Sequence, residues 1–163
     1  MNQDQRSQSW IPIKTWEHFW HPVCTLHEFR CAKPAGRGPL KVRLLGRDFA
    51  IVEIDSEVVA LRDRCCHRSA SLSCGNSEPD GLRCKYHGWK YAGTGKCIDI
   101  PSNPHGPIPK QAAVPAFDCC VRYGLVWVRI NSELAVTEIP AHPAWDDSRY
   151  KCVMGEPYTW QTS

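Results

Sequence analysis

The chain has 163 residues and a formal net charge of +3, and 42% of its residues are hydrophobic. This length fits one domain of ordinary size with some tail, and a second domain of usual size does not fit. No basic stripe is interleaved with stacking aromatics, which argues against nucleic acid as a partner, and the longest apolar runs are far shorter than a membrane span.

Ten cysteines are a high number for a chain of this length. Residues 1–9 are polar and no apolar run follows them, so the sequence shows no secretory signal peptide. In a reducing cytosol, thiols bind metals more often than they form disulfides. We therefore expect a cytoplasmic protein with metal-binding cysteines.

The N-terminal part reads as a loose leader over residues 1–15, followed by a dense aromatic and histidine cluster over residues 16–21. Glu17, His18 and His21 offer the two imidazoles and one carboxylate of a mononuclear iron site. We favour a packing element that leads into the first strand over such a site.

The segment from residue 41 to residue 61 is patterned as a meander of short strands. Its apolar residues alternate with polar ones or form short runs, and turn-forming residues separate these runs. The three expected strands are residues 41–44, 49–54 and 58–61. The last of them leads the chain into Cys65.

The second half contains a tight turn, a proline-rich stretch and a hairpin. An Asp-Gly pair is a turn signal after which residues 82–84 can return antiparallel. Five prolines between residues 101 and 115 exclude a helix or a central strand, so we expect a rigid extended loop over the surface. Residues 120–122 and 125–130 then form a hairpin, and the expected fold is all-β.

Two short segments carry the chemistry, and each has one thiol and one imidazole. Cys65 and His67 stand in Cys-Cys-His-Arg, and Cys84 and His87 stand in Cys-Lys-Tyr-His-Gly-Trp. A tetrahedral zinc site usually takes like ligands from one segment, whereas a Rieske 2Fe-2S centre has two Cys on one iron and two His on the other. Two facing loops with one Cys and one His each satisfy the second arrangement. We favour this centre and keep a structural zinc site as the alternative.

Beyond these ligands, the sequence resembles the Rieske non-haem iron oxygenases of the ring-hydroxylating and O-demethylating kind. The shared stretches cover most of the chain and include Trp20-His21-Pro22-Val23, Leu44-Leu45-Gly46, both ligand segments, Ile100-Pro101-Ser102-Asn103-Pro104 and Arg122-Tyr123-Gly124-Leu125-Val126-Trp127-Val128. Respiratory-chain Rieske proteins instead carry an extra Cys in each ligand loop and a Ser shortly after the second His. Here Tyr86 and Trp89 stand at the corresponding places of the second loop.

The resemblance implies an all-β Rieske iron-sulfur domain of antiparallel sheets with a small cluster-binding subdomain. The cofactor would be a Rieske-type 2Fe-2S cluster held by the two cysteines and two histidines named above, with no catalytic residue. The implied organisation is a leader over residues 1–15, a Rieske domain over 16–132 with cluster-binding loops at 65–68 and 84–89, and a tail over 133–163 toward a catalytic domain.

In this family the catalytic domain holds a mononuclear iron on two His and a carboxylate. After His87 only His105 and His142 remain, and each is isolated. We therefore expect electron transfer, without oxygenase turnover by this chain alone. The resemblance implies a ferredoxin or flavin reductase as electron donor, the catalytic domain of an oxygenase as acceptor, and a trimer in the full-length family. The alternative is a free-standing Rieske-type ferredoxin that passes electrons to a separate oxygenase.

The charge is unevenly distributed, because seven cations and only three anions lie between Arg62 and Lys96. This excess is either a solvated loop surface or a patch that steers an acidic electron donor.

Three positions depart from the family pattern: Cys66 and Lys85 stand where Pro is common, and Ser69 stands where Gly is common. We expect Ser69 to adopt a backbone angle that Gly takes freely, and Cys66 places a spare thiol beside a ligand. The remaining cysteines are expected to be small apolar fillers or inert thiols. They are Cys24, Cys31, Cys74, Cys97, Cys119, Cys120 and Cys152.

Overall fold

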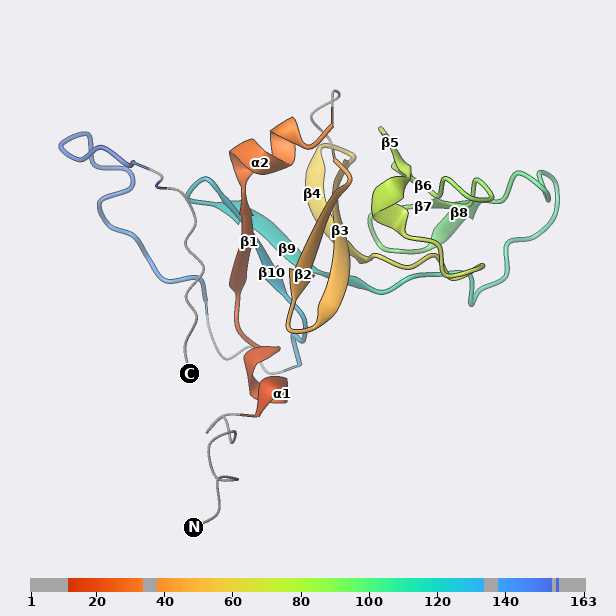
Figure 1. Ribbon diagram of the computed structural model, residues 1–163, viewed down its shortest axis with the longest axis horizontal. Coiled ribbons are helices and arrows are strands. Elements are labelled where there is room, and N and C mark those ends of the chain that lie inside the picture. Colours follow the sequence, from red (N-terminus) through yellow and green to blue (C-terminus); the bar gives the residue numbers. More distant parts are fainter. Residues whose placement is uncertain (1–11, 34–37, 134–137, 154, 156–163) are drawn as a thin grey trace, which may run out of the picture.

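The computed structural model describes residues 12–33, 38–133, 138–153 and 155. Two antiparallel sheets form the fold (Figure 1): a six-stranded sheet in the order β1-β10-β9-β4-β3-β2 and a four-stranded sheet in the order β5-β6-β7-β8. The expected all-β class with a small separate subdomain is confirmed.

The strands of the larger sheet are β1 (His21–Thr25), β2 (Leu40–Leu44), β3 (Arg47–Ile54), β4 (Glu57–Arg62), β9 (Ala116–Arg122) and β10 (Leu125–Arg129). Those of the smaller sheet are β5 (Asn76–Glu78), β6 (Gly81–Arg83), β7 (Lys90–Tyr91) and β8 (Cys97–Asp99). The strands expected at residues 41–61 and the hairpin expected at residues 120–130 are both present.

Three two-residue turns connect neighbouring strands of the larger sheet, and in each of them both residues have positive φ. This backbone conformation matches the twist of the strands that it joins. The pairs are Leu45 with Gly46, Asp55 with Ser56, and Tyr123 with Gly124. These turns fix the register of the meander and of the β9–β10 hairpin.

Three short helices were not expected from the sequence. They are α1 (Ile13–Trp16), α2 (Leu26–Cys31) and the 3₁₀ helix η1 (Leu72–Cys74). Helix α2 begins with a capping box, in which Thr25 Oγ1 accepts a hydrogen bond from the Glu28 N–H at 3.0 Å and Glu28 Oε2 accepts one from the Thr25 N–H at 2.7 Å. Helix α1 begins inside the stretch that we expected to be a leader, and residues 1–11 lie outside the described residues.

Strand β3 is buried on both faces and separates two hydrophobic cores. Phe49 and Ile51 face the core within the six-stranded sheet, together with Phe29 and Val126. The alternate residues of β3 face a second core that the larger sheet shares with the smaller one. This double burial explains the unbroken apolar run in β3, because both faces of the strand exclude water.

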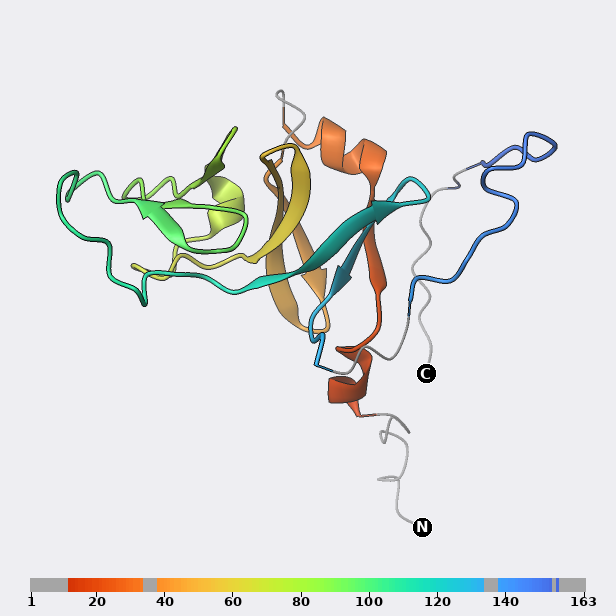
Figure 2. The same cartoon turned by 180° about the vertical axis from the view of Figure 1, so that it is seen from behind.

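The smaller sheet is part of an insertion between β4 and β9, two strands that pair with each other. Figure 2 shows the chain leaving the larger sheet at β4, forming the separate lobe, and returning along residues 101–115 to β9. The returning stretch has no helix, and its only ladder contact is a bridge from Ala113 to Lys96. The expectation that this proline-rich stretch is a loop, without helix or central strand, is therefore confirmed, although it contains turns and is not extended throughout.

Candidate metal centre

The two ligand segments fold as two loops with the same backbone hydrogen bonds. In the first loop, residues 65–70, the Cys65 carbonyl accepts from the Ser69 N–H at 2.9 Å and the Cys65 N–H donates to the Ala70 carbonyl at 2.8 Å. In the second loop, residues 84–89, the corresponding distances are 3.0 Å from the Gly88 N–H to the Cys84 carbonyl and 2.8 Å from the Cys84 N–H to the Trp89 carbonyl. Two unrelated stretches of sequence thus present a cysteine in the same local conformation.

The fifth residue of each loop has a left-handed backbone. Ser69 has φ of 57° and Gly88 has φ of 75°. Only glycine takes this region without a steric cost. The strained conformation expected at Ser69 is therefore present.

The two cysteine thiols lie in the core that the sheets share, and Cys65 and Cys84 are each 3% exposed. Their side chains interact with each other, and burial raises the pKa of the Cys84 thiol. The backbone N–H groups of Tyr86 and His87 donate toward the Cys84 sulfur and oppose this rise in pKa. Such donors stabilise a thiolate, the form of cysteine that binds a metal.

The Tyr91 hydroxyl group contacts two cysteines of the first loop. The Tyr91 side chain is fully buried, and its Oη lies 3.0 Å from Cys65 Sγ and 3.3 Å from Cys66 Sγ. Against a metal-bound thiolate the hydroxyl has to donate the hydrogen bond. The sequence motif did not reveal this contact, because Tyr91 lies in β7 and reaches Cys65 only through tertiary packing.

The two imidazoles lie together at the surface. The ring centroids of His67 and His87 are 4.6 Å apart, and both residues are exposed. The Trp89 ring stacks on the His67 ring with 4.6 Å between the ring centroids and an interplanar angle of 4°. The ring centroids of Tyr86 and His87 are 3.8 Å apart. Desolvation and the neighbouring His87 and Arg68 lower the pKa of His67, which favours the neutral imidazole that a metal requires.

One charged side chain stabilises each loop: Asp63, two residues before Cys65, and Arg83, directly before Cys84. Before the first loop, the buried Asp63 carboxylate accepts from Ser71 Oγ at 2.7 Å, from the Ser73 N–H at 2.6 Å and from Ser73 Oγ at 2.8 Å. Before the second loop, Arg83 Nη1 donates to the Gly88 carbonyl at 2.8 Å. Asp63 thus holds the chain that follows the first loop close to the chain that enters it, and Arg83 does the same for the end of the second loop.

The guanidinium of Arg83 belongs to an ion-pair network beneath the second loop. Arg83 Nη1 lies 2.7 Å from Asp99 Oδ2, and its Nε bonds to Glu78. Lys90, 9% exposed, pairs with Glu78 at 2.9 Å and with Asp80 at 2.6 Å. Arg83 and Lys90 together lower the pKa of Glu78 to about 2. Two of the seven cations counted from the sequence are therefore neutralised inside the fold.

The remaining histidine and carboxylate cluster of the N-terminal part does not form a metal site. The Glu17 carboxylate pairs with Arg47 at 2.6 Å, and His21 Nε2 lies 2.8 Å from the Trp16 carbonyl oxygen. Over the described parts of the chain, no three His, Cys, Asp or Glu side chains are arranged to hold one metal ion. The packing interpretation of residues 16–21 agrees with these contacts.

The seven non-ligand cysteines other than Cys66 divide into two groups. In the first group, burial raises the pKa of Cys24 to about 11 and that of Cys119 to about 12, and it also raises the pKa of Cys97 and Cys120, so these four thiols are inert. Cys31, Cys74 and Cys152 are exposed and do not fill the core, and Cys31 Sγ lies 3.7 Å from His27 Nε2. Cys66 is exposed as well.

A paired set of thiols and a paired set of imidazoles fit a Rieske 2Fe-2S cluster. Each iron of such a cluster takes two protein ligands, so no single ion needs three side chains around it. The thiols are buried among apolar groups and the imidazoles are exposed, which suits a cluster with its cysteine iron inside and its histidine iron outside.

The comparison with known proteins agrees with this donor set. Residues 19–118 match the Rieske [2Fe-2S] domain family. The chain belongs to this family and its cofactor is a Rieske-type 2Fe-2S cluster.

The relatives include proteins described as oxygenase subunits, as the resemblance implied. Methylxanthine N1-demethylase NdmA of Pseudomonas putida is 47% identical over 90% of this chain and 42% of its own length. Methylxanthine N3-demethylase NdmB of the same organism is 42% identical over 89% of this chain and 42% of its own length. The solved structure of Pseudomonas putida CBB5 NdmA with caffeine has a TM-score of 0.82 at 47% identity and covers 83% of this chain and 40% of that one. The chain thus spans about two fifths of the length of these relatives.

One further relative is an oxidoreductase. Oxidoreductase NdmD of Pseudomonas putida is 34% identical over 69% of this chain and 18% of its own length. Within the described residues, no helix is both long and apolar enough to cross a membrane.

Proposed function

We propose that this chain is the electron-transfer domain of a Rieske oxygenase system, with Cys65, His67, Cys84 and His87 as the ligands of the cluster. The observation that carries the proposal is the geometry of the two loops, which share one backbone scaffold and bring two buried thiols and two exposed imidazoles together. When bound, a 2Fe-2S cluster of this kind supplies reversible one-electron chemistry.

The protein residues separate an inner side of the site from an outer side. Cys65 and Cys84 lie in a core that excludes water, and Tyr91 provides a hydrogen-bond donor to Cys65. His67 and His87 lie at the surface with Trp89 and Tyr86 beside them. Because both imidazoles are exposed, they provide a route by which an electron can leave the domain toward a partner.

We propose a ferredoxin or flavin reductase as electron donor and the catalytic domain of an oxygenase as acceptor, as in the family. The two demethylases at 47% and 42% identity support oxidative demethylation as the reaction that the electrons serve. These relatives also favour the oxygenase role over a free-standing ferredoxin. We further propose the organisation expected from the sequence, with the domain at residues 16–132 and a tail from residue 133, of which residues 134–137, 154 and 156–163 lie outside the described residues.

The test is to replace each of the four ligands by Ala and to measure iron content and the EPR signal of the reduced protein. We expect two irons per chain in the unaltered protein and loss of the signal in each variant. Cys74→Ala is the matched control, because Cys74 is exposed, lies outside both loops, and should leave the signal unchanged. A ligand variant that keeps the full signal would contradict the assignment of that residue.

A further inference from the structure

A basic hollow lies beside the first ligand loop, and Cys65 is the one proposed ligand among the residues that line it. One part of it, about 460 Å³, is lined by residues of the β2–β3 turn, the end of β4 and the start of β9. A second part, about 260 Å³, continues from the same Arg62, Arg64 and Pro115 to Cys65 and Cys66. Neither His67 nor His87 lines either part. The hollow therefore reaches the site from its cysteine side.

The backbone around Asp63 directs two arginines into this hollow. The Arg62 N–H donates to the Pro115 carbonyl at 2.9 Å, and the Asp63 N–H donates to the Asp48 carbonyl at 3.0 Å. The Asp63 side chain points inward to its serine partners. Because side chains alternate along an extended chain, Arg62 and Arg64 point outward, and both are exposed.

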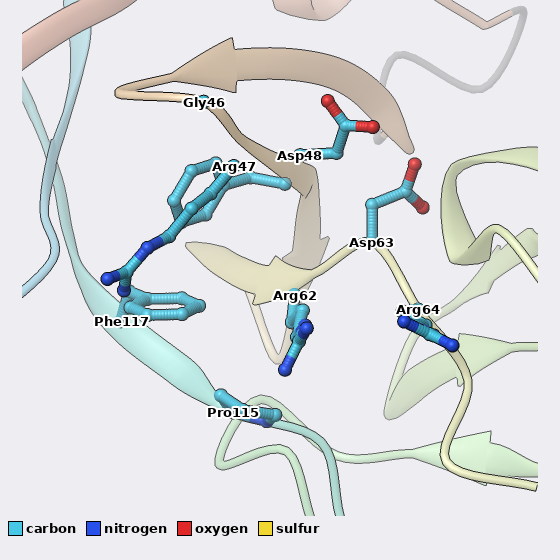
Figure 3. A pocket seen from close by; sticks show the side chains of 9 residues that line it. Gly46, Arg47, Asp48, Arg62, Asp63, Arg64, Pro115 and Phe117 are labelled. Atoms are coloured by element: carbon cyan, nitrogen blue, oxygen red, sulfur yellow. The ribbon is translucent and has the colours of Figure 1, made fainter. Parts of the chain in front are cut away.

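The charges around the hollow leave Arg62 and Arg64 as its available cations. Among the described residues neither has an ion pair or a side-chain hydrogen bond, whereas Arg47 pairs with Glu17 at 2.6 Å. Each carboxylate of the hollow has a partner as well, since Asp48 Oδ2 pairs with Lys41 at 3.0 Å and the buried Asp63 accepts from hydroxyl and amide donors. Asp48 Oδ1 accepts no hydrogen bond from the described residues. Figure 3 shows Arg62 and Arg64 on the side of Pro115, with Asp48 and Asp63 together on the other side.

We propose that this hollow is the docking surface for an acidic electron-donor protein, which approaches the site at Cys65. The inference rests on the proposed electron-transfer function and adds the place where the electron enters. Exposed cations without partners attract an acidic protein over a long range and increase its association rate. The hollow continues to a ligand cysteine, so a donor seated on it brings its redox group close to the site. This arrangement leaves the exposed histidine side free for the acceptor.

The experiment compares Arg62→Glu/Arg64→Glu with the unaltered holoprotein. The donor is a reduced acidic plant-type 2Fe-2S ferredoxin, and stopped-flow absorbance gives the second-order rate constant of reduction. We expect a loss of at least about tenfold at about 20 mM ionic strength, and we expect the difference to shrink at about 0.5 M salt because screening shortens the range of the charges. The affinity for oxidised ferredoxin, measured by titration calorimetry, should fall in parallel.

Two controls separate docking from other effects. Lys33→Glu/Lys151→Glu makes the same change in net charge at exposed residues that do not line the hollow, and should change the rate less than about twofold. Photoreduced deazariboflavin, a small neutral reductant, should reduce all three proteins at the same rate. Arg62→Lys/Arg64→Lys keeps the charges and should keep most of the ferredoxin rate.

Three outcomes would overturn the proposal: a ferredoxin rate unchanged in the Arg→Glu variant, an equal loss in the lysine control, or an equal loss with deazariboflavin. A fourth outcome would also overturn it: if inorganic phosphate binds and the Arg→Glu variant loses this binding while its ferredoxin binding is unchanged, the hollow is a site for a small anion instead. If the unaltered protein takes no electron from deazariboflavin, the proposed function itself fails, and that result is distinct from a defect confined to the ferredoxin.

Discussion

The two ligand loops have the same backbone and differ in how their conformation is stabilised. In the first loop the left-handed position is Ser69, and the charged group that stabilises the loop is the buried Asp63 carboxylate, which accepts from hydroxyl and amide groups. In the second loop the left-handed position is Gly88, and the preceding charged residue is an arginine in an ion-pair network. One geometry is therefore reached through two sets of interactions. The first loop has more backbone strain, and the second depends more on charge.

The largest loss of stability is expected on removal of the Asp63 carboxylate, the buried acceptor on which the first loop depends. Asp63→Ala removes the partner of three donors and leaves the buried Ser73 N–H without one, at a cost of about 3–4 kcal/mol in the free energy of unfolding. Denaturant unfolding of the holoprotein measures this cost. Asp118→Ala, which breaks the half-exposed pair with Arg129, should cost less than about 1 kcal/mol. Similar losses in both variants would show that Asp63 has no special role.

Gly88→Ala tests whether the second loop needs its glycine. An added Cβ would lie 2.9 Å from Cγ of Pro101, at a residue with φ of 75°. Steric overlap and backbone strain together should destabilise the protein by about 2–3 kcal/mol, and the iron content after purification should fall. Gly46→Ala has a similar φ of 77° and nothing within 4 Å of the added Cβ. It should lose only about 1 kcal/mol of stability, from backbone strain. Equal losses of stability in Gly88→Ala and Gly46→Ala would exclude a role for Pro101.

Ser69→Gly should remove the strain of the first loop and make the two loops alike. Relief of the left-handed conformation is expected to stabilise the protein by about 1 kcal/mol. Cluster loss in air should therefore become about fivefold slower. Absorbance decay of the oxidised protein measures this rate. Ser56→Gly relieves a similar φ of 67° in the β3–β4 turn, outside both loops, and should leave the rate of cluster loss unchanged. Faster loss in Ser69→Gly would mean that the serine side chain itself stabilises the loop.

Tyr91→Phe removes the hydrogen bond that the first loop receives from β7. A donor to a ligand sulfur stabilises the more negative, reduced state, so its loss should lower the reduction potential. A difference of about 1 kcal/mol between the two redox states corresponds to about 40 mV for one electron. Protein-film voltammetry measures the shift, and Cys66→Ala serves as control, because it leaves the Tyr91 hydroxyl bonded to Cys65 alone. An unchanged or higher potential in Tyr91→Phe would contradict this role.

The smallest effect concerns acid, which acts on the ion pairs beneath the second loop. Arg83 and Lys90 lower the pKa of Glu78 from 4.5 to about 2. Its stabilising contribution is therefore fully present above about pH 4.5 and is lost as the pH falls toward 2. Glu78→Gln should be less stable than the unaltered protein at about pH 6.5, and the difference should shrink at about pH 3. Denaturant midpoints at both pH values test this, and a difference independent of pH would contradict it.

The strands of this protein were predictable because their signals are local, and the proposed ligands rest on signals of the same kind. The meander at residues 41–61 alternates with a period of two, and the ligand segments keep their cysteines and histidines within a few residues of each other. The left-handed backbone at Ser69 was also predictable, from its departure from the family pattern. Helix α2 could have been predicted from Thr25 and Glu28, which form a capping box in the sequence.

Only the tertiary structure decided which charged and polar residues act on the site. Tyr91 lies 26 residues from Cys65, and Arg83 is 16 residues from Asp99. From the sequence alone Arg83 and Arg64 are equivalent cations. In the fold, Arg83 is neutralised by ion pairs beneath the second loop, whereas Arg64 stays exposed. Residue type and local spacing determined the chemistry of the ligands. Packing between distant segments determined their environment, because hydrogen bonds and ion pairs depend on distances that the order of residues does not contain.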